Sequence, residues 1–352
     1  MSLRYLVPTL GLVAFTATPA MAADVGGLNI GGYVDTILTI ADGDEALTGA
    51  DGDATIDFSA AAQIEVGYQI GDNVSANVEL YYDEDGFDAD NLEQAYVNWA
   101  INEEVALRMG KMHNWIGWEG TDAPELYRVN NSYMYAGGTL GGNGADGIWG
   151  VDVTGLGVII TPNEQFEIGL FIVDYIYFDD NGLADDQARG TDALSFGAYG
   201  TWNVEGIGYF DLDIGFGMDE SVSSTGTSGD IFQLDLNGEI DAIREDNGWL
   251  FAFDINYTDY DVSAALGILA LANFALPTET PMSLTGSLNY FDPDDDSTTG
   301  EDDEGIEFAL ALLANPTDNE NFSTNVELRY ISRSADDANE FGFFVEALAV
   351  IP

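Results

Sequence analysis

Residues 56–70 read IDFSAAAQIEVGYQI, and this stretch decides the fold. Its even-numbered positions, from Ile56 to Ile70, are all apolar, whereas its odd-numbered positions are polar or small. Because successive side chains of a strand point to opposite faces, this alternation predicts a β-strand with one apolar and one polar face. A usual strand has only about five or six residues. The question is therefore whether the long apolar face packs against a protein core or against lipid.

The same alternation recurs along the chain and predicts about sixteen strands. The segments are 28–41, 56–70, 74–83, 92–101, 105–112, 147–161, 165–178, 191–204, 207–218, 230–241, 247–258, 261–274, 282–292, 305–314, 322–333 and 341–351. From the second segment on, short connections such as 71–73 and 102–104 alternate with long acidic ones such as 179–190. Short turns at one end and long loops at the other are typical of an up-and-down meander.

The length of the segments favours lipid over a protein core. Most have 10 to 15 residues, which suits a strand that crosses a bilayer at a tilt. One open sheet of this size would leave two long unpaired edges, and the strands of a sandwich are shorter. Closure into a barrel pairs every backbone N–H and C=O group without water. We therefore predict an all-β fold, a closed antiparallel up-and-down transmembrane β-barrel with the apolar face outside.

The N-terminus predicts export. Residues 1–22 combine Arg4, a short apolar region and the cleavage pattern Ala20-Met21-Ala22, which is typical of a secretory signal peptide. The barrel is then expected to span residues 23–352. The chain has no cysteine, so an exported protein of this length must be held by backbone bonding and packing.

The charge excludes one class of partner and predicts another. There are 63 acidic residues against 8 Lys and Arg, a formal charge of −55, which excludes a nucleic-acid partner. Alternation predicts these acids in the lumen: Asp35, Asp57, Glu65, Glu79, Asp211, Asp213, Asp235, Glu239, Asp254, Glu307, Glu327 and Glu346. It predicts only three bases there: Arg108, Arg329 and Arg333. A lumen of one sign concentrates the opposite ion, so the sequence predicts a preference for cations.

The third long connection, 113–146, is the longest, and ordered loops of this length usually serve a function. Together with LEQAYVNWAINEEVALRMGKMHNWIGWEG (92–120), in which an "AYV" strand precedes an "LR-x-GK" strand, the chain resembles Gram-negative outer-membrane porins. The resemblance implies an outer-membrane diffusion channel for small hydrophilic solutes and ions, assembled as a homotrimer. It also implies a third loop folded into the lumen as the constriction. The ending Val350-Ile351-Pro352 departs from the aromatic terminus of many porins.

Five charged residues are candidates for that constriction. We expect Asp122 and Glu125 of the loop to face Arg108, Lys111 and Arg128 across the narrowest point. A transverse field of this kind would orient dipolar solutes. The alternative is that these charges pair locally and only hold the loop in place.

Catalytic and metal sites are weakly indicated. The single histidine, His113, has no serine at a matching short spacing, so no enzyme is predicted. Asp292, Asp294 and Asp296 match the first positions of a calcium loop, but Ser297 replaces the glycine of the sharp turn. A solvated acidic loop with weak Ca²⁺ binding is the alternative to a calcium site, and no other cofactor is expected.

The alternative to a channel is a structural or adhesive barrel whose acidic loops bind partners or divalent ions.

Overall fold

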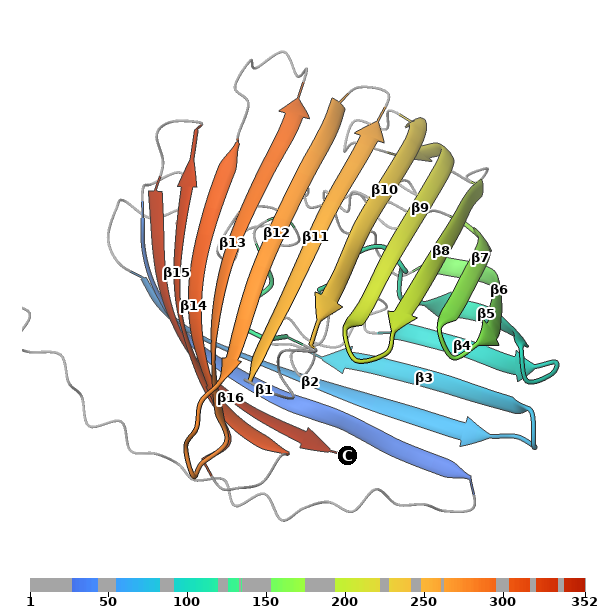
Figure 1. Ribbon diagram of the computed structural model, residues 1–352, viewed down its shortest axis with the longest axis horizontal. Coiled ribbons are helices and arrows are strands. Elements are labelled where there is room, and N and C mark those ends of the chain that lie inside the picture. The colour runs from blue at the N-terminus through green and yellow to red at the C-terminus, as the bar shows by residue number, and fades with distance from the viewer. Residues whose placement is uncertain are drawn as a thin grey trace, which may run out of the picture.

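The computed structural model is a closed barrel of sixteen antiparallel strands (Figure 1). It describes residues 27–43, 55–82, 92–119, 126–132, 134, 153–174, 194–221, 228–241, 248–260, 263–295, 304–316, 321–334 and 339–351. Residues 1–22, the predicted signal peptide, lie outside these ranges. In the part of the chain that is described, no helix is long and apolar enough to cross a membrane.

The strands follow one another in chain order around the barrel. The first eight are β1 (Leu28–Gly43), β2 (Thr55–Gln69), β3 (Val74–Tyr82), β4 (Leu92–Ala100), β5 (Val105–Met112), β6 (Val153–Asn163), β7 (Phe166–Val173) and β8 (Leu194–Val204). The others are β9 (Gly208–Ser221), β10 (Ser228–Ile240), β11 (Trp249–Tyr260), β12 (Ser263–Ala275), β13 (Met282–Asp295), β14 (Gly305–Ala314), β15 (Phe322–Arg333) and β16 (Asn339–Ile351).

Each strand pairs with its sequence neighbours, and β1 also pairs with β16. The closing register runs from Gly32↔Ile351 to Gly43↔Glu340. Closure leaves no strand edge with unpaired N–H and C=O groups. The predicted fold, a closed antiparallel up-and-down barrel of sixteen strands, is confirmed.

The two faces of the barrel wall have opposite polarity. On β2, Ile56 and Phe58 point outward and are 63% and 61% exposed. On β10, Leu234 and Leu236 also point outward, whereas the alternating residue Asp235 points inward and is fully buried. The wall is therefore apolar outside and polar inside, the reverse of a water-soluble protein.

Aromatic rings cluster on the outer face where β7 to β12 meet the short turns. Phe166 and Trp202 stack with centroids 6.2 Å apart, and Trp202 also contacts Phe210. Trp249 contacts Phe274 at 4.6 Å on the neighbouring pair β11–β12. Rings at this level match the interfacial girdles of barrels in membranes.

Several strand boundaries differ from those expected, including those of β7, β9 and β13. β6 is described from Val153, and residues 147–152 of the expected strand lie outside the described residues. β13 continues to Asp295, so Asp292 and Asp294 lie in a strand and not in a calcium loop, while Asp296 lies outside the described residues. β13 therefore extends into the first residues of the acidic connection expected at 293–304, since it stays paired with β12 as far as Ser263↔Asp295.

Candidate functional site

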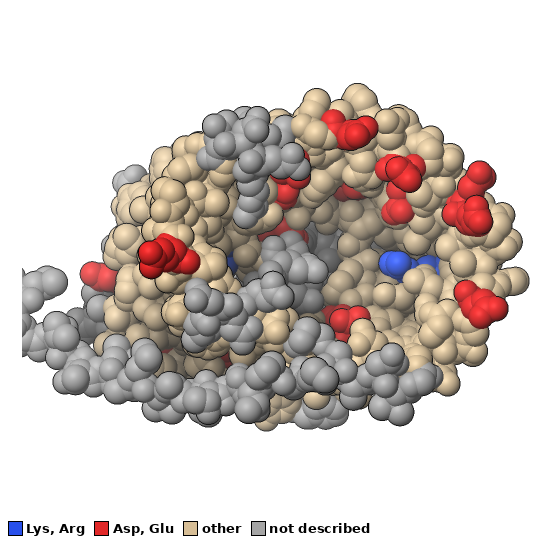
Figure 2. Space-filling model, turned by 60° about the horizontal axis from the view of Figure 1, so that its bottom comes forward, with Lys and Arg blue, Asp and Glu red and all other residues tan. Residues whose placement is uncertain are grey.

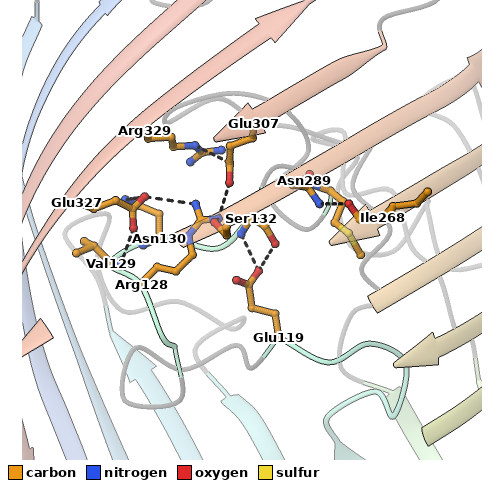
Figure 3. Close-up of polar contacts among 12 residues, drawn as sticks. Glu119, Arg128, Val129, Asn130, Ser132, Ile268, Asn289, Glu307, Glu327 and Arg329 are labelled. Carbon is orange, nitrogen blue, oxygen red and sulfur yellow. Dashed lines mark hydrogen bonds and ion pairs between the residues drawn. The ribbon is translucent and has the colours of Figure 1, made fainter. Parts of the chain in front are cut away.

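Part of the third loop lies inside the barrel against the wall formed by β11, β13, β14 and β15 (Figure 3). The Trp118 N–H donates to Asp254 Oδ2 at 2.9 Å, and the Val129 N–H donates to Glu327 Oε2 at 2.8 Å. The acceptors are inward-facing side chains of β11 and β15. Backbone N–H groups that a loop leaves unpaired are thus satisfied by polar side chains of the wall.

Arg128 is the charged anchor of this segment, and its side chain is completely buried. Its Nη1 contacts Glu307 Oε1 and donates to Ser287 Oγ at 2.9 Å, while Nη2 lies 3.3 Å from Glu327 Oε1. Arg329 Nε completes the network 2.8 Å from Glu307 Oε2. Burial lowers the pKa of Arg128, but the two carboxylates outweigh burial and raise the pKa above its usual value, so the guanidinium stays charged.

Glu119 holds the two arms of the loop together. Its Oε2 accepts hydrogen bonds from the N–H and the Oγ–H of Ser132, both at 2.6 Å. Complete burial raises the pKa of the Glu119 carboxyl above its usual 4.5, and the nearby Arg128 only partly opposes this. This carboxyl therefore retains its proton to a higher pH in the folded protein than in the unfolded chain.

The raised pKa of Glu119 predicts a pH-dependent stability. Between the usual carboxyl pKa and the raised one, the folded protein binds a proton that the unfolded chain has lost, so the free energy of unfolding falls as pH rises. Glu119→Gln cannot ionise. We expect it to be more stable than wild type at neutral pH, with the difference vanishing in acid, as measured by guanidinium unfolding across a pH series. Glu103→Gln, in an exposed turn, is the control; equal pH profiles for wild type and Glu119→Gln would contradict the assignment.

Apolar contacts hold the same loop segment. Trp118 stacks on Tyr127 with centroids 5.9 Å apart, and both rings pack against buried Leu250 of β11. Met134 is fully buried in a second cluster with Leu269. The segment is thus fixed by ion pairs, backbone hydrogen bonds and apolar packing together.

The opposite wall, β4 to β9, keeps charged side chains partly exposed to the lumen. Arg108 Nε donates to Asn98 Oδ1 at 3.0 Å, and its guanidinium carbon lies 4.7 Å from the centre of the Tyr96 ring. Glu167 Oε1 accepts a hydrogen bond from the Tyr199 hydroxyl at 2.7 Å. Charged side chains that solvent reaches therefore line this side of the barrel.

Aromatic rings lie flat on glycines of the same wall. A Cβ at Gly157 would be 2.4 Å from the Phe171 ring, one at Gly169 would be 2.2 Å from the Tyr199 ring, and one at Gly197 would be 1.6 Å from the Trp115 ring. Trp115 also stacks on Phe171, with centroids 4.5 Å apart and planes 7° apart. We call Trp115, Phe171 and Tyr199 the ring platform. The platform was not predicted from the sequence, although glycines at inward positions of neighbouring strands were its signal.

The strand alternation places the predicted lumen residues on the inward face. They are Asp57, Glu65, Glu79, Asp211, Asp213, Asp235, Glu239, Glu327, Arg329 and Arg333. Their exposure varies widely: Asp57 and Glu65 are exposed, whereas Asp213, Asp235 and Glu327 are fully buried. Facing inward and contacting water are therefore different properties in this barrel.

The described members of the predicted constriction set, Arg108, Lys111 and Arg128, have separate contacts. Arg128 is buried in the β13–β15 wall, where the alternative of local pairing describes its contacts, and Arg108 lies on the opposite wall. Lys111 pairs with Ala95 and lies two residues after Met109, so both side chains point to the outer face. Its Nζ donates to the Leu92 carbonyl at 2.6 Å. The expectation that Lys111 faces the lumen was therefore wrong. Asp122 and Glu125 lie outside the described residues.

His113 lies beside a carboxylate. Its Nε2 is 3.5 Å from Glu79 Oε1, and Gln94 Nε2 donates to the other oxygen of Glu79 at 2.5 Å. Within the described ranges, no group of three His, Asp or Glu side chains is arranged to hold a metal ion.

Acidic residues surround the opening at the end that comes forward in Figure 2, and Lys or Arg atoms are visible in the hollow. The described short turns carry exposed acids: Asp72, Glu103, Glu104, Glu164, Glu205 and Glu279. Negative charge therefore extends from the interior to the short-turn rim.

No protein-family model matches the sequence, and no curated protein matches it either. Among solved structures, OprB of Pseudomonas putida matches with a TM-score of 0.63 and 9% identity, covering 92% of this chain and 94% of that one. The outer membrane channel DcaP of Acinetobacter baumannii gives 0.61 and 10%, covering 92% and 96%. An anion-selective porin from Comamonas acidovorans gives 0.60 and 13%, covering 92% and 99%. At these identities the likeness shows the fold, and the chain has the closed sixteen-stranded barrel fold of outer-membrane porins.

Proposed function

We propose that this protein is an outer-membrane porin, a water-filled diffusion channel for small hydrophilic solutes and ions that prefers cations. The observation that carries the proposal is a closed barrel with an apolar outer face and an inner wall that keeps charged side chains exposed. The likeness to OprB, DcaP and the Comamonas porin supports it, and it also supports a location in the outer membrane. The lone His113–Glu79 pair gives no basis for an enzyme.

The passage is expected to run along β4 to β9. The described loop segments pack on β11 to β15 and bury the inward side chains there, such as Glu327. On the β4–β9 side, Arg108, Glu167 and Asp211 remain partly exposed. Permeating solutes would therefore pass beside these side chains rather than through the centre of the barrel.

The sign of the exposed charge supports cation preference. Exposed or partly exposed inward acids include Asp57, Glu65, Glu167, Asp211 and Glu239, while the described inward bases with partial exposure are Arg108 and Arg333. A pore lined mainly by carboxylates raises the local cation concentration. The anion-selective Comamonas porin has the same fold, so the fold alone does not decide which ion a channel prefers.

Planar bilayer recordings test the proposal. Purified protein should give stepwise ohmic conductance, and in a salt gradient the reversal potential should show cation preference. Arg108→Ala should move the reversal potential further toward that of a cation-only pore, because it removes an exposed positive charge from the passage. Lys111→Ala, on the outward face, should leave it unchanged. Anion preference in wild type, or no effect of Arg108→Ala, would contradict the assignment.

The extensive burial of the β11–β15 wall favours one alternative, a structural or adhesive barrel whose lumen is closed. A folded protein that gives no conductance steps would support that alternative. For assembly we propose a homotrimer, supported by the similar OmpT of Vibrio cholerae, whose structure includes a trimer form. Chemical cross-linking in detergent tests the trimer directly.

A further inference from the structure

We propose that the ring platform, together with Glu167 and Asp211, is a binding subsite for organic ammonium cations that carry an aromatic ring. The inference rests on the proposed channel function and names a class of solute for which the passage is selective. It depends on the stacked rings, on the carboxylates beside them, and on the Arg108 guanidinium that lies over the Tyr96 ring.

The rings pack against one another on the inward side of the wall. Phe171 is buried beneath Trp115, while Trp115 and Tyr199 remain partly exposed. The centroids of Phe171 and Tyr199 are 5.7 Å apart and their planes are tilted by 31°, so the three rings are in contact. The glycines behind them leave room for the rings against the wall. An aromatic solute can stack on the exposed part of Trp115 or Tyr199.

Carboxylates border the platform on the side of the short turns. Glu167 binds the Tyr199 hydroxyl, and Asp211 accepts a hydrogen bond from Thr201 Oγ1 at 2.8 Å. Thr201, the next inward residue after Tyr199, pairs with Glu167 on β7 and with Asp211 on β9, so both acids lie beside the platform. An ammonium group next to a stacked ring would therefore meet two carboxylates.

The wall already shows this type of contact. The Arg108 guanidinium lies over Tyr96, which packs against the same apolar cluster as Trp115 and Tyr199. Cations bind aromatic faces through the ring quadrupole, and quaternary ammonium groups are recognised in this way. Anionic aromatic solutes would be repelled by Glu167 and Asp211, and inorganic cations gain nothing from stacking. An aromatic ammonium ion uses both features of the site.

Current block by benzyltrimethylammonium, compared with tetramethylammonium, tests the subsite. In wild type we expect benzyltrimethylammonium to reduce the potassium current at a concentration about ten-fold lower, a difference within the range of one aromatic stacking contact. Tyr199→Leu should remove this preference, whereas Tyr199→Phe, which keeps the ring, should retain it. Phe196→Leu removes an outward-facing ring from the same strand and should also retain it. Arg108→Gln should strengthen the block, because it removes a like charge.

Calorimetric titration of benzyltrimethylammonium into the detergent-solubilised protein measures binding independently of current. A channel that conducts but is blocked equally by both ions overturns the subsite and leaves the porin proposal standing. The same holds if Tyr199→Leu keeps the stronger block by benzyltrimethylammonium. Weaker block in Arg108→Gln also overturns the subsite. That result would mean that the positive charge of Arg108 helps to hold the blocker, which is not expected for a cation. Absence of conductance overturns the porin proposal, and calorimetry then decides the subsite: saturable binding lost in Tyr199→Leu supports it, and no binding overturns it.

Discussion

Arg128→Met is expected to lower the free energy of unfolding by roughly 3–5 kcal/mol and to increase the single-channel conductance. Removing one partner of a buried ion pair leaves the other charges uncompensated, which is the source of this large penalty. Glu327 would lose the guanidinium, and Glu307 would lose one of its two ion-pair contacts with arginine, keeping that with Arg329. The loop would lose its charged anchor to β14 and β15 and open the passage. Guanidinium unfolding in lipid vesicles and planar bilayer recordings measure the two effects.

Lys111→Met is the matched control, because it removes a cation of similar length from the outward face beside the same loop. It should change neither the stability nor the conductance appreciably. Adding Glu327→Gln to Arg128→Met should recover part of the lost stability, because it removes one uncompensated charge. If Arg128→Met were as stable as wild type with the same conductance, Arg128 would not be the anchor.

Gly197→Ala is expected to displace Trp115 from the ring platform. The new Cβ would lie 1.6 Å from Trp115 Cζ2, and something must shift because carbon atoms cannot approach so closely. The ring belongs to the third loop, so the loop must move with it. Overpacking of this kind typically costs about 1–3 kcal/mol. We expect lower stability in guanidinium unfolding and a changed tryptophan fluorescence spectrum.

Gly200→Ala provides the control on the same strand, since no atom lies within 4 Å of its added Cβ. This variant should keep the wild-type spectrum and stability. A second comparison separates the clash from general strain: Trp115→Ala combined with Gly197→Ala should cost no more than Trp115→Ala alone. If Gly197→Ala behaved like Gly200→Ala, Trp115 would not be packed on Gly197.

The alternation of side chains was sufficient to predict most of the fold. Residues 56–70 and their repeats predict the number of strands, their antiparallel order and the face to which each side chain points. These properties depend on a period of two and on short turns, which are local in the sequence. The alternation is weakest in β6, because inward glycines such as Gly155 and Gly157 interrupt the pattern.

The site was less predictable because its contacts are distant in the sequence. Arg128 meets Glu307 across 179 residues, and no local pattern indicates which inward carboxylates the loop covers. The alternation predicts that Glu327 faces inward but not that it is shielded from water. Lys111 was misplaced because its charge suggested the lumen, although the phase of β5 sets it outward with Met109. The glycines beneath the rings became meaningful only once neighbouring strands were in register.

The pairing of β1 with β16 has a consequence for biogenesis. Before β16 pairs with β1, the other fifteen strands form an open sheet with two unpaired edges. Each edge can pair with a strand of another molecule. The barrel can close only when residues 339–351 pair with β1, so the polypeptide must be kept from self-association until that pairing forms. A truncation that removes β16 should therefore give aggregates rather than a smaller closed barrel.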